Sequence, residues 1–132
     1  MKPFEPVNLD RYLDERPQDG VLRVDRTIFT DPDIFELEME RIWERTWLFL
    51  CHESQIPNAG DFITTVMGRQ PVIVMRAPSG AVNVFINACS HRGSQLLREE
   101  HGNRTDITCF FHGWCFDTDG KLKSVTREKG GG

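Results

Sequence analysis

Two short segments of the sequence each pair one cysteine with one histidine. The first, "CSHRG", places Cys89 and His91 two residues apart, and the second, "CFFHGW", places Cys109 and His112 three residues apart. The 17 residues from 92 to 108 separate the two pairs. Thiolate sulfur and imidazole nitrogen are both ligands for transition metals. A fold of this chain that brings the two segments together would therefore create a metal site with two ligands from each.

The use of cysteine also favours a metal site over disulfide bonds. The chain has 4 cysteines, and its N-terminus, "MKPFEPVNLD", lacks the apolar stretch of a secretion signal. Disulfide frameworks are typical of exported proteins, whereas cysteines in cytoplasmic proteins more often bind metals or act in catalysis. We therefore expect a cytoplasmic protein.

Composition limits the classes of protein further. With 132 residues, 39% hydrophobic and 27% charged, the chain has the make-up of one globular domain or of part of a larger protein. Its longest apolar run, Trp47 to Cys51, is far too short to span a membrane. The net charge of −4 is spread along the chain without a basic stripe, so nucleic acid is not an expected partner.

Residues 60–125 have the pattern of an antiparallel β domain. Short segments rich in Val, Ile, Phe and Thr alternate with turn signals such as Pro78-Ser79-Gly80 and the "DTDG" that ends at Gly120. The fold class expected from this pattern is mainly β. The expected strands are "DFITTVM", "PVIVMRA", "AVNVFINA", "DITCF", "WCFDT" and "KLKSV".

An N-terminal arm and one amphipathic helix precede the β domain. We expect the arm over residues 1–30, the helix and its lead-in over 31–50, and the β domain over 51–132. Thr30 or Asp31 can cap the helix, and Pro32 suits its first turn. An apolar stripe at helical spacing, which we expect to pack on a sheet, comprises Phe35, Met39, Ile42, Trp43 and Trp47. The chain ends in "GGG" without a closing element, which suggests a truncated chain.

The arrangement of the ligands indicates which metal group they bind. Zinc sites of the Cys₂His₂ type usually pair Cys with Cys and His with His, whereas here each segment supplies one of each. This mixture is typical of a [2Fe–2S] cluster with two Cys ligands on one iron and two His ligands on the other. We therefore expect Cys89, His91, Cys109 and His112 to bind such a cluster, with a zinc-stabilised interaction domain as the alternative.

These two motifs resemble those of Rieske iron–sulfur proteins, and in particular the α subunits of aromatic-ring-hydroxylating dioxygenases. The resemblance extends through "HESQIP", "MGRQPV" and "INACSHRG", and it is strongest to the branch that oxidises benzoate, toluate, halobenzoate or anthranilate. It covers nearly the whole chain after residue 20.

The resemblance implies a role in electron transfer. The cluster would accept electrons from a ferredoxin or reductase and pass them to a mononuclear Fe(II) that dihydroxylates an aromatic carboxylate such as benzoate. That iron needs two histidines and a carboxylate, and only His52 and His101 remain, so we expect the iron in a catalytic domain that is absent here. Implied partners are other α subunits in a trimer and a β subunit. The alternative is a free-standing Rieske-type ferredoxin.

The same resemblance implies a low reduction potential. High-potential respiratory Rieske proteins brace their cluster loops with a disulfide, at positions that match Ser94 and Phe111. They also donate hydroxyl hydrogen bonds to the cluster, from positions that match Trp114 and Phe116. Without these features, we expect a midpoint near the low end of the Rieske range, about −150 mV.

Overall fold

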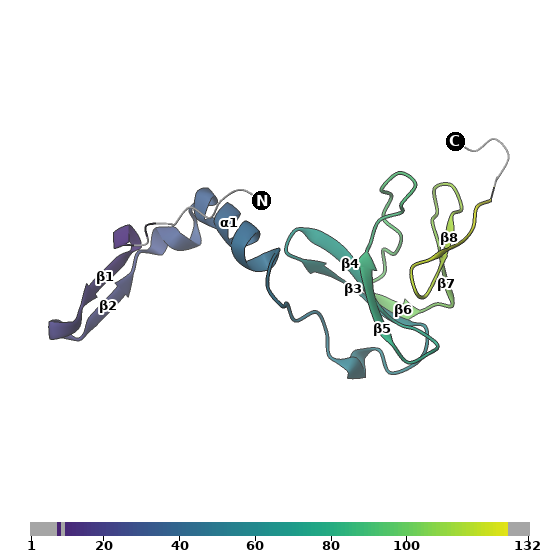
Figure 1. The fold of residues 1–132 in the computed structure, drawn as a ribbon, viewed down its shortest axis with the longest axis horizontal. Coiled ribbons are helices and arrows are strands. Elements are labelled where there is room, and N and C mark those ends of the chain that lie inside the picture. Colours follow the sequence, from purple (N-terminus) through teal and green to yellow (C-terminus); the bar gives the residue numbers. More distant parts are fainter. Residues whose placement is uncertain (1–7, 9, 127–132) are drawn as a thin grey trace. The chain divides into compact units, whose positions relative to one another are not determined.

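The computed structural model describes residue 8 and residues 10–126 (Figure 1). The chain divides into two compact units, residues 1–46 and 47–132. The expectations for residues 1–7 and for the glycines at 130–132 lie outside the described residues.

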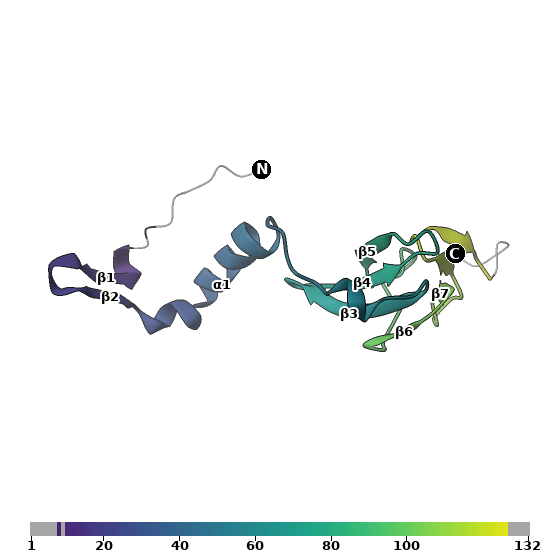
Figure 2. The ribbon, with the colours of Figure 1, turned by 90° about the horizontal axis from the view of Figure 1, so that it is seen from below.

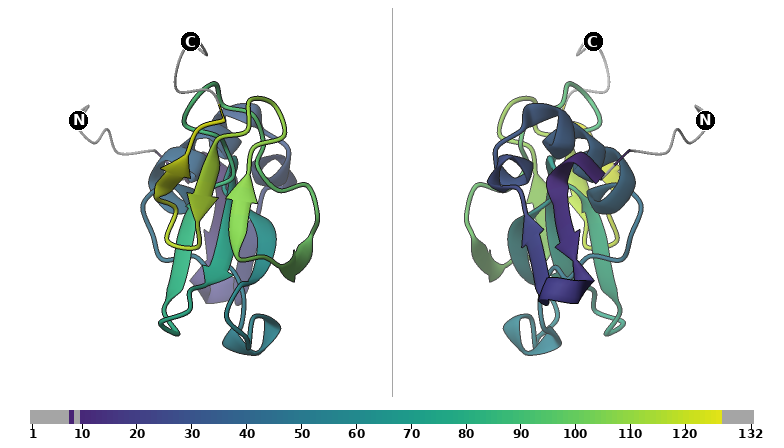
Figure 3. Two further views of the ribbon diagram at one scale, coloured as in Figure 1. Left: turned by 90° about the vertical axis from the view of Figure 1, so that its right-hand side faces the viewer. Right: turned by 90° about the vertical axis from the view of Figure 1, so that its left-hand side faces the viewer.

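The first unit begins with a β-hairpin that the sequence pattern did not predict. Strands β1 (Leu13–Arg16) and β2 (Val21–Val24) pair antiparallel, and the turn between them is the 3₁₀ segment η2 (Pro17–Asp19) (Figure 3). Gly20 closes this turn with φ 65°, a value that glycine adopts without strain. The pattern missed the hairpin because the strands are short and mostly exposed.

The helix begins where the sequence predicts and ends earlier. Helix α1 (Pro32–Glu38) is capped by Asp31, whose side chain accepts hydrogen bonds from the backbone N–H groups of Asp33 and Ile34. It continues as a π-helical turn, η4 (Met39–Trp43), instead of running on through residue 50. Because five residues form this π turn, the apolar stripe loses its regular spacing there.

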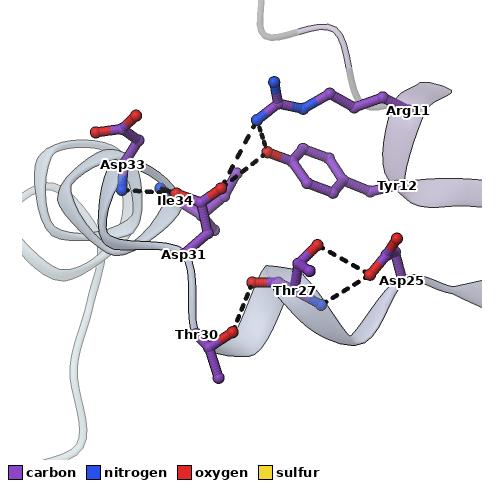
Figure 4. A network of polar contacts seen from close by, with 8 residues as sticks. All are labelled: Arg11, Tyr12, Asp25, Thr27, Thr30, Asp31, Asp33 and Ile34. Atoms are coloured by element: carbon purple, nitrogen blue, oxygen red, sulfur yellow. Dashed lines mark hydrogen bonds and ion pairs between the residues drawn. The ribbon is translucent and has the colours of Figure 1, made fainter.

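Asp31 also anchors the preceding segment to the helix (Figure 4). The Tyr12 hydroxyl lies 3.5 Å from a carboxylate oxygen of Asp31, and the Arg11 guanidinium lies 3.8 Å from the same oxygen. Tyr12 is buried in spite of its polar tip. Within this unit, Ile34 and Met39 are the buried residues of the helical segment, and the packing of the stripe on a sheet stays a prediction.

The second unit contains two antiparallel sheets (Figures 1 and 2), in agreement with the predicted mainly β fold. The larger sheet has the order β5-β4-β3-β6, and the smaller has the order β7-β8-β9. Strand β6 lies in a polar segment that is not among the strands expected from the sequence. The strands are β3 (Asp61–Met67), β4 (Gln70–Arg76), β5 (Val82–Ile86), β6 (His101–Asn103), β7 (Asp106–Thr108), β8 (Cys115–Asp117) and β9 (Leu122–Ser124).

One hydrophobic core joins the two sheets. Ile107 of β7 is fully buried against Phe62, Ile73 and Met75 of the larger sheet, together with Leu97. A polar contact supports the same arrangement, because the Asn83 side chain on β5 donates to the Thr118 carbonyl after β8. The core therefore holds the ends of β5 and β7, from which the two Cys-His segments leave. Within the described residues, no helix has the length and apolarity needed to cross a membrane.

Candidate metal centre

The two Cys-His segments form loops at the same end of the second unit (Figures 1 and 3). The first loop, Cys89 to Ser94, follows β5, and the second, Cys109 to Trp114, joins β7 to β8. Cys89 and Cys109 are 3% and 2% exposed, so the sulfur atoms lie inside the domain.

The backbones of the two loops form the same turn. In the first, Cys89 N–H donates to the Ser94 carbonyl at 2.8 Å and Gly93 N–H donates to the Cys89 carbonyl at 2.8 Å. In the second, Cys109 N–H donates to the Trp114 carbonyl at 2.8 Å. The corresponding second hydrogen bond, from the N–H group of the glycine four positions after Cys109 to the Cys109 carbonyl, is 2.9 Å long.

The fifth residue of each turn is a glycine with a left-handed backbone. Gly93 has φ 70° and Gly113 has φ 71°, values at which other residues are strained. The two turns therefore match, and the histidines differ only in place: His91 is the third residue of its turn and His112 is the fourth of its own. The C-x-H and C-x-x-H spacings therefore place an imidazole at two different positions of the same kind of turn.

The two thiols lie together in the interior of the domain. They hydrogen-bond to each other, and Phe116, Leu96 and Trp114 pack around them. Burial raises the pKa of the Cys89 thiol. Burial acts in the same direction on Cys109, but hydrogen bonds from the N–H groups of Phe111 and His112 and from the Cys89 thiol outweigh it and lower the pKa of Cys109. Amide donors aimed at sulfur favour thiolate, which is the metal-binding form.

The two imidazoles form a second pair. The ring centroids of His91 and His112 are 4.7 Å apart, and their planes are 72° apart, so both rings can reach one metal ion. His91 is half-buried and His112 is exposed. Desolvation and the positive charges of His91 and Arg92 lower the pKa of His112, which favours the neutral imidazole that binds metals.

This donor set fits a [2Fe–2S] cluster. Two buried thiols lie beside each other and two more accessible imidazoles lie beside each other, which matches one iron with two Cys ligands and one iron with two His ligands. Among residues 10–126, no three His, Cys, Asp or Glu side chains gather at a point where they could hold a metal ion. A cluster with two protein ligands on each iron needs two pairs rather than such a group.

A further residue, Asn87, organises the site and was not singled out from the sequence. The buried amide of Asn87 donates to the Leu97 carbonyl at 2.8 Å and accepts hydrogen bonds from the N–H groups of Leu96 and Leu97. It therefore fixes the chain on both sides of the first loop. The sequence shows an asparagine two residues before Cys89, but it does not show that this side chain is buried, so the role of Asn87 could not be predicted.

Ser94 also organises the site, in a role other than the loop-bracing position to which the sequence comparison matched it. Its hydroxyl hydrogen-bonds to the sulfur of Cys109, so it links the first loop to the second. Hydrogen bonds to cluster sulfurs raise the reduction potential, which opposes the lowering expected from the absence of hydroxyls at Trp114 and Phe116.

The remaining cysteines and histidines lie outside this arrangement. Cys115 is on β8, and Cys51 precedes the segment η5 (Glu53–Gln55). His52 caps η5, since its ring nitrogen accepts a hydrogen bond from the Ser54 N–H at 3.2 Å. His101 is an exposed residue of β6.

Comparison with known proteins gives the class of this domain. The Rieske [2Fe–2S] domain model matches residues 46–130, which include both loops. The chain belongs to the Rieske [2Fe–2S] domain family.

The chain is also similar to large subunits of bacterial dioxygenases. It is 51% identical over 113 residues to the anthranilate 1,2-dioxygenase large subunit of Acinetobacter baylyi, an alignment that covers 86% of this chain and 24% of that protein. It is 48% identical over 124 residues to the toluate 1,2-dioxygenase subunit alpha of Pseudomonas putida, covering 94% and 27%. The biphenyl 2,3-dioxygenase subunit alpha of Rhodococcus jostii is 49% identical over 125 residues, covering 95% and 27%.

Solved structures give the same result. Naphthalene 1,2-dioxygenase with indole bound superposes with a TM-score of 0.74 at 44% identity, covering 76% of this chain and 23% of that chain. The Rhodococcus sp. naphthalene 1,2-dioxygenase bound to indole gives 0.75 at 38% identity, covering 79% and 24%. The chain thus spans about a quarter of the length of these proteins. They are oxygenase subunits, which favours the oxygenase interpretation over a free-standing ferredoxin.

Proposed function

We propose that Cys89 and Cys109 bind one iron of the [2Fe–2S] cluster and that His91 and His112 bind the other. The observation that carries this proposal is the sorting of the four side chains into a buried thiol pair and a more exposed imidazole pair. Each motif contains one residue of each kind, and this sorting agrees with the two-Cys and two-His division expected from the sequence.

When bound, the cluster supplies one-electron transfer. The protein controls where the electron can enter and leave. Burial of Cys89 and Cys109 excludes water from the sulfur side, while the exposed ring of His112 provides an edge that a partner protein can reach. Two neutral imidazoles in place of two thiolates leave the oxidised site uncharged, so an electron is easier to add than in a ferredoxin with four cysteines.

The whole protein, we propose, is the large subunit of a ring-hydroxylating dioxygenase that acts on an aromatic carboxylate such as benzoate. In this proposal a ferredoxin or reductase donates the electrons. The domain passes them to a mononuclear Fe(II) in a catalytic domain, within a cytoplasmic trimer of α subunits that can include a β subunit. The resemblance to anthranilate and toluate dioxygenase subunits supports this assignment.

The ligand assignment is tested by spectroscopy of variants. The chain is expressed with iron and sulfide and kept anaerobic, and the reduced protein is studied by electron paramagnetic resonance. Cys89→Ser and His112→Ala should each abolish the Rieske signal, because each removes one iron ligand. Cys115→Ser is the matched control and should keep the signal. A colourless zinc protein, or a cluster that survives both ligand changes, would contradict the assignment.

The substrate assignment needs a separate measurement. The full-length subunit, supplied with its electron donor, should convert benzoate to a dihydroxylated product with consumption of O₂. Turnover of unsubstituted benzene but not of benzoate would contradict the proposed carboxylate substrate.

A further inference from the structure

Six side chains, five of them aromatic, form a continuous row across the two cluster loops. The indole of Trp114, from the second loop, stacks on the imidazole of His91, from the first loop, with centroids 4.8 Å apart and planes 7° apart. His91 meets His112 edge-on at 4.7 Å, and Phe111 lies 4.0 Å from His112 with a tilt of 37°. Phe110 follows at 6.3 Å from Phe111, and the Arg98 guanidinium covers Phe110 at 4.2 Å.

Each candidate histidine ligand thus has its own aromatic neighbour. Trp114 lies flat against His91, and Phe111 lies against His112. Trp114 is itself held in place, because it packs against the buried cluster that Cys89, Cys109 and Phe116 form. A ring that is packed on one side by the core can hold a neighbouring ring in one orientation.

The Trp114–His91 stack is also a bridge between the loops. The two residues belong to different turns, so the stack resists relative movement of these turns. No disulfide joins the loops, since Cys51, Cys89, Cys109 and Cys115 are all free.

We propose that Trp114 and Phe111 are positioning residues that separately fix the ring orientations of His91 and His112 on the histidine-bound iron, with the Trp114–His91 stack serving as a non-covalent brace between the loops. This inference rests on the ligand assignment proposed above.

The test compares three leucine variants of the cluster-loaded chain by pulsed electron paramagnetic resonance, which resolves the nitrogen couplings of both imidazoles. Trp114→Leu should change the coupling of one imidazole, and Phe111→Leu should change the other. Phe110→Leu is the control, because Phe110 lies in the same loop and its ring contacts are with Phe111 and Arg98. A structural disturbance without specific positioning would alter both couplings in every variant.

The role of the Trp114–His91 stack as a brace can also be tested by measuring the rate at which an iron chelator bleaches the cluster. Stacked aromatic pairs stabilise by an amount that corresponds to about a two- to tenfold change, so Trp114→Leu should bleach faster by that factor. Trp114→Phe keeps a ring that can stack and should lie between the wild type and Trp114→Leu. If Trp114→Leu does not take up the cluster, Trp114→Phe is compared with the wild type instead.

The outcomes separate the two proposals. A wild-type protein without couplings from two imidazoles would overturn the ligand assignment. A wild-type protein with both couplings, whose Trp114→Leu and Phe111→Leu variants match Phe110→Leu, would overturn the positioning role alone.

Discussion

Single side chains adjust the properties of the site within a turn that the backbone already defines. The sulfur of Cys109 accepts backbone hydrogen bonds from its own loop and one from the hydroxyl of Ser94 in the other loop. Backbone donors of this kind exist whatever the side chains are, whereas the Ser94 hydroxyl depends on one residue. Ser94 is therefore a residue at which the potential can be changed without altering the ligands.

Ser94→Ala should lower the midpoint potential of the cluster. The hydroxyl stabilises the more negative reduced state, so its loss makes reduction harder. A net hydrogen bond of ordinary strength corresponds to about 20–60 mV for one electron. Redox titration of the variant measures the shift, and Ser90→Ala, an exposed serine in the same loop, is the control. An unchanged or higher midpoint in Ser94→Ala would contradict the assigned hydrogen bond.

Asn87 acts on the loop through the backbone. Asn87→Leu should lower the free energy of unfolding by about 1–3 kcal/mol, because the amide groups of Leu96 and Leu97 and the Leu97 carbonyl lose a buried partner. Denaturant unfolding measures the loss. Gln95→Leu is the matched control, since the exposed Gln95 amide donates to the same Leu97 carbonyl at 3.0 Å. Equal effects of the two changes would show that burial of the Asn87 contact does not matter.

At the scale of the elements, two matching turns carry the candidate ligands, and a glycine closes each turn in the left-handed region. The surroundings of the two glycines differ. A Cβ on Gly93 would meet nothing within 4 Å, whereas a Cβ on Gly113 would lie 2.0 Å from Oγ1 and 3.0 Å from Cβ of Thr126. Substitutions at the two glycines therefore distinguish the cost of backbone strain, which both share, from the cost of a steric clash, which arises only at Gly113.

Gly93→Ala should destabilise the chain by the cost of the left-handed backbone alone, about 1–2 kcal/mol. Gly113→Ala should cost more, because the new methyl group also collides with Thr126. Thermal unfolding of both variants tests this order. Combining Gly113→Ala with Thr126→Ala should recover part of the extra loss, while leaving the strain in place. A larger loss in Gly93→Ala than in Gly113→Ala would refute the steric argument.

At the scale of the whole molecule, the position of the site depends on the packing of one sheet on the other within residues 47–126. The first loop leaves the larger sheet after β5, and the second leaves the smaller sheet after β7. Ile107, one of the residues that joins the sheets, is only two positions before Cys109. Core packing and ligand geometry are therefore coupled.

Ile107→Ala should lower the free energy of unfolding by about 2–5 kcal/mol, the usual cost of truncating a fully buried isoleucine. It should also speed the loss of the cluster to a chelator, because the cavity loosens the contact that sets the distance between the loops. Val66→Ala, at a β3 position that is 61% exposed, is the control and should change neither quantity appreciably. Loss of stability without faster bleaching would show that the sheets and the site are not coupled.

The mainly β pattern, the start of the helix and the identity of the candidate ligands could all be predicted from the sequence. These features follow from local chemistry: alternation of apolar residues, a capping aspartate before proline, and thiols spaced with imidazoles. The short strands β1, β2 and β6 escaped prediction, since they are exposed and have no apolar period.

The contacts between the two loops, by contrast, became visible with the folded structure. Each motif contains one cysteine and one histidine, and the meeting of two matching turns places thiol beside thiol in the interior and imidazole beside imidazole nearer the surface. The stacking of Trp114 on His91 and the hydrogen bond from Ser94 to Cys109 likewise join residues from different loops. Such contacts arise from the packing of two sheets, and residues far apart in the sequence carry no local signal of that packing.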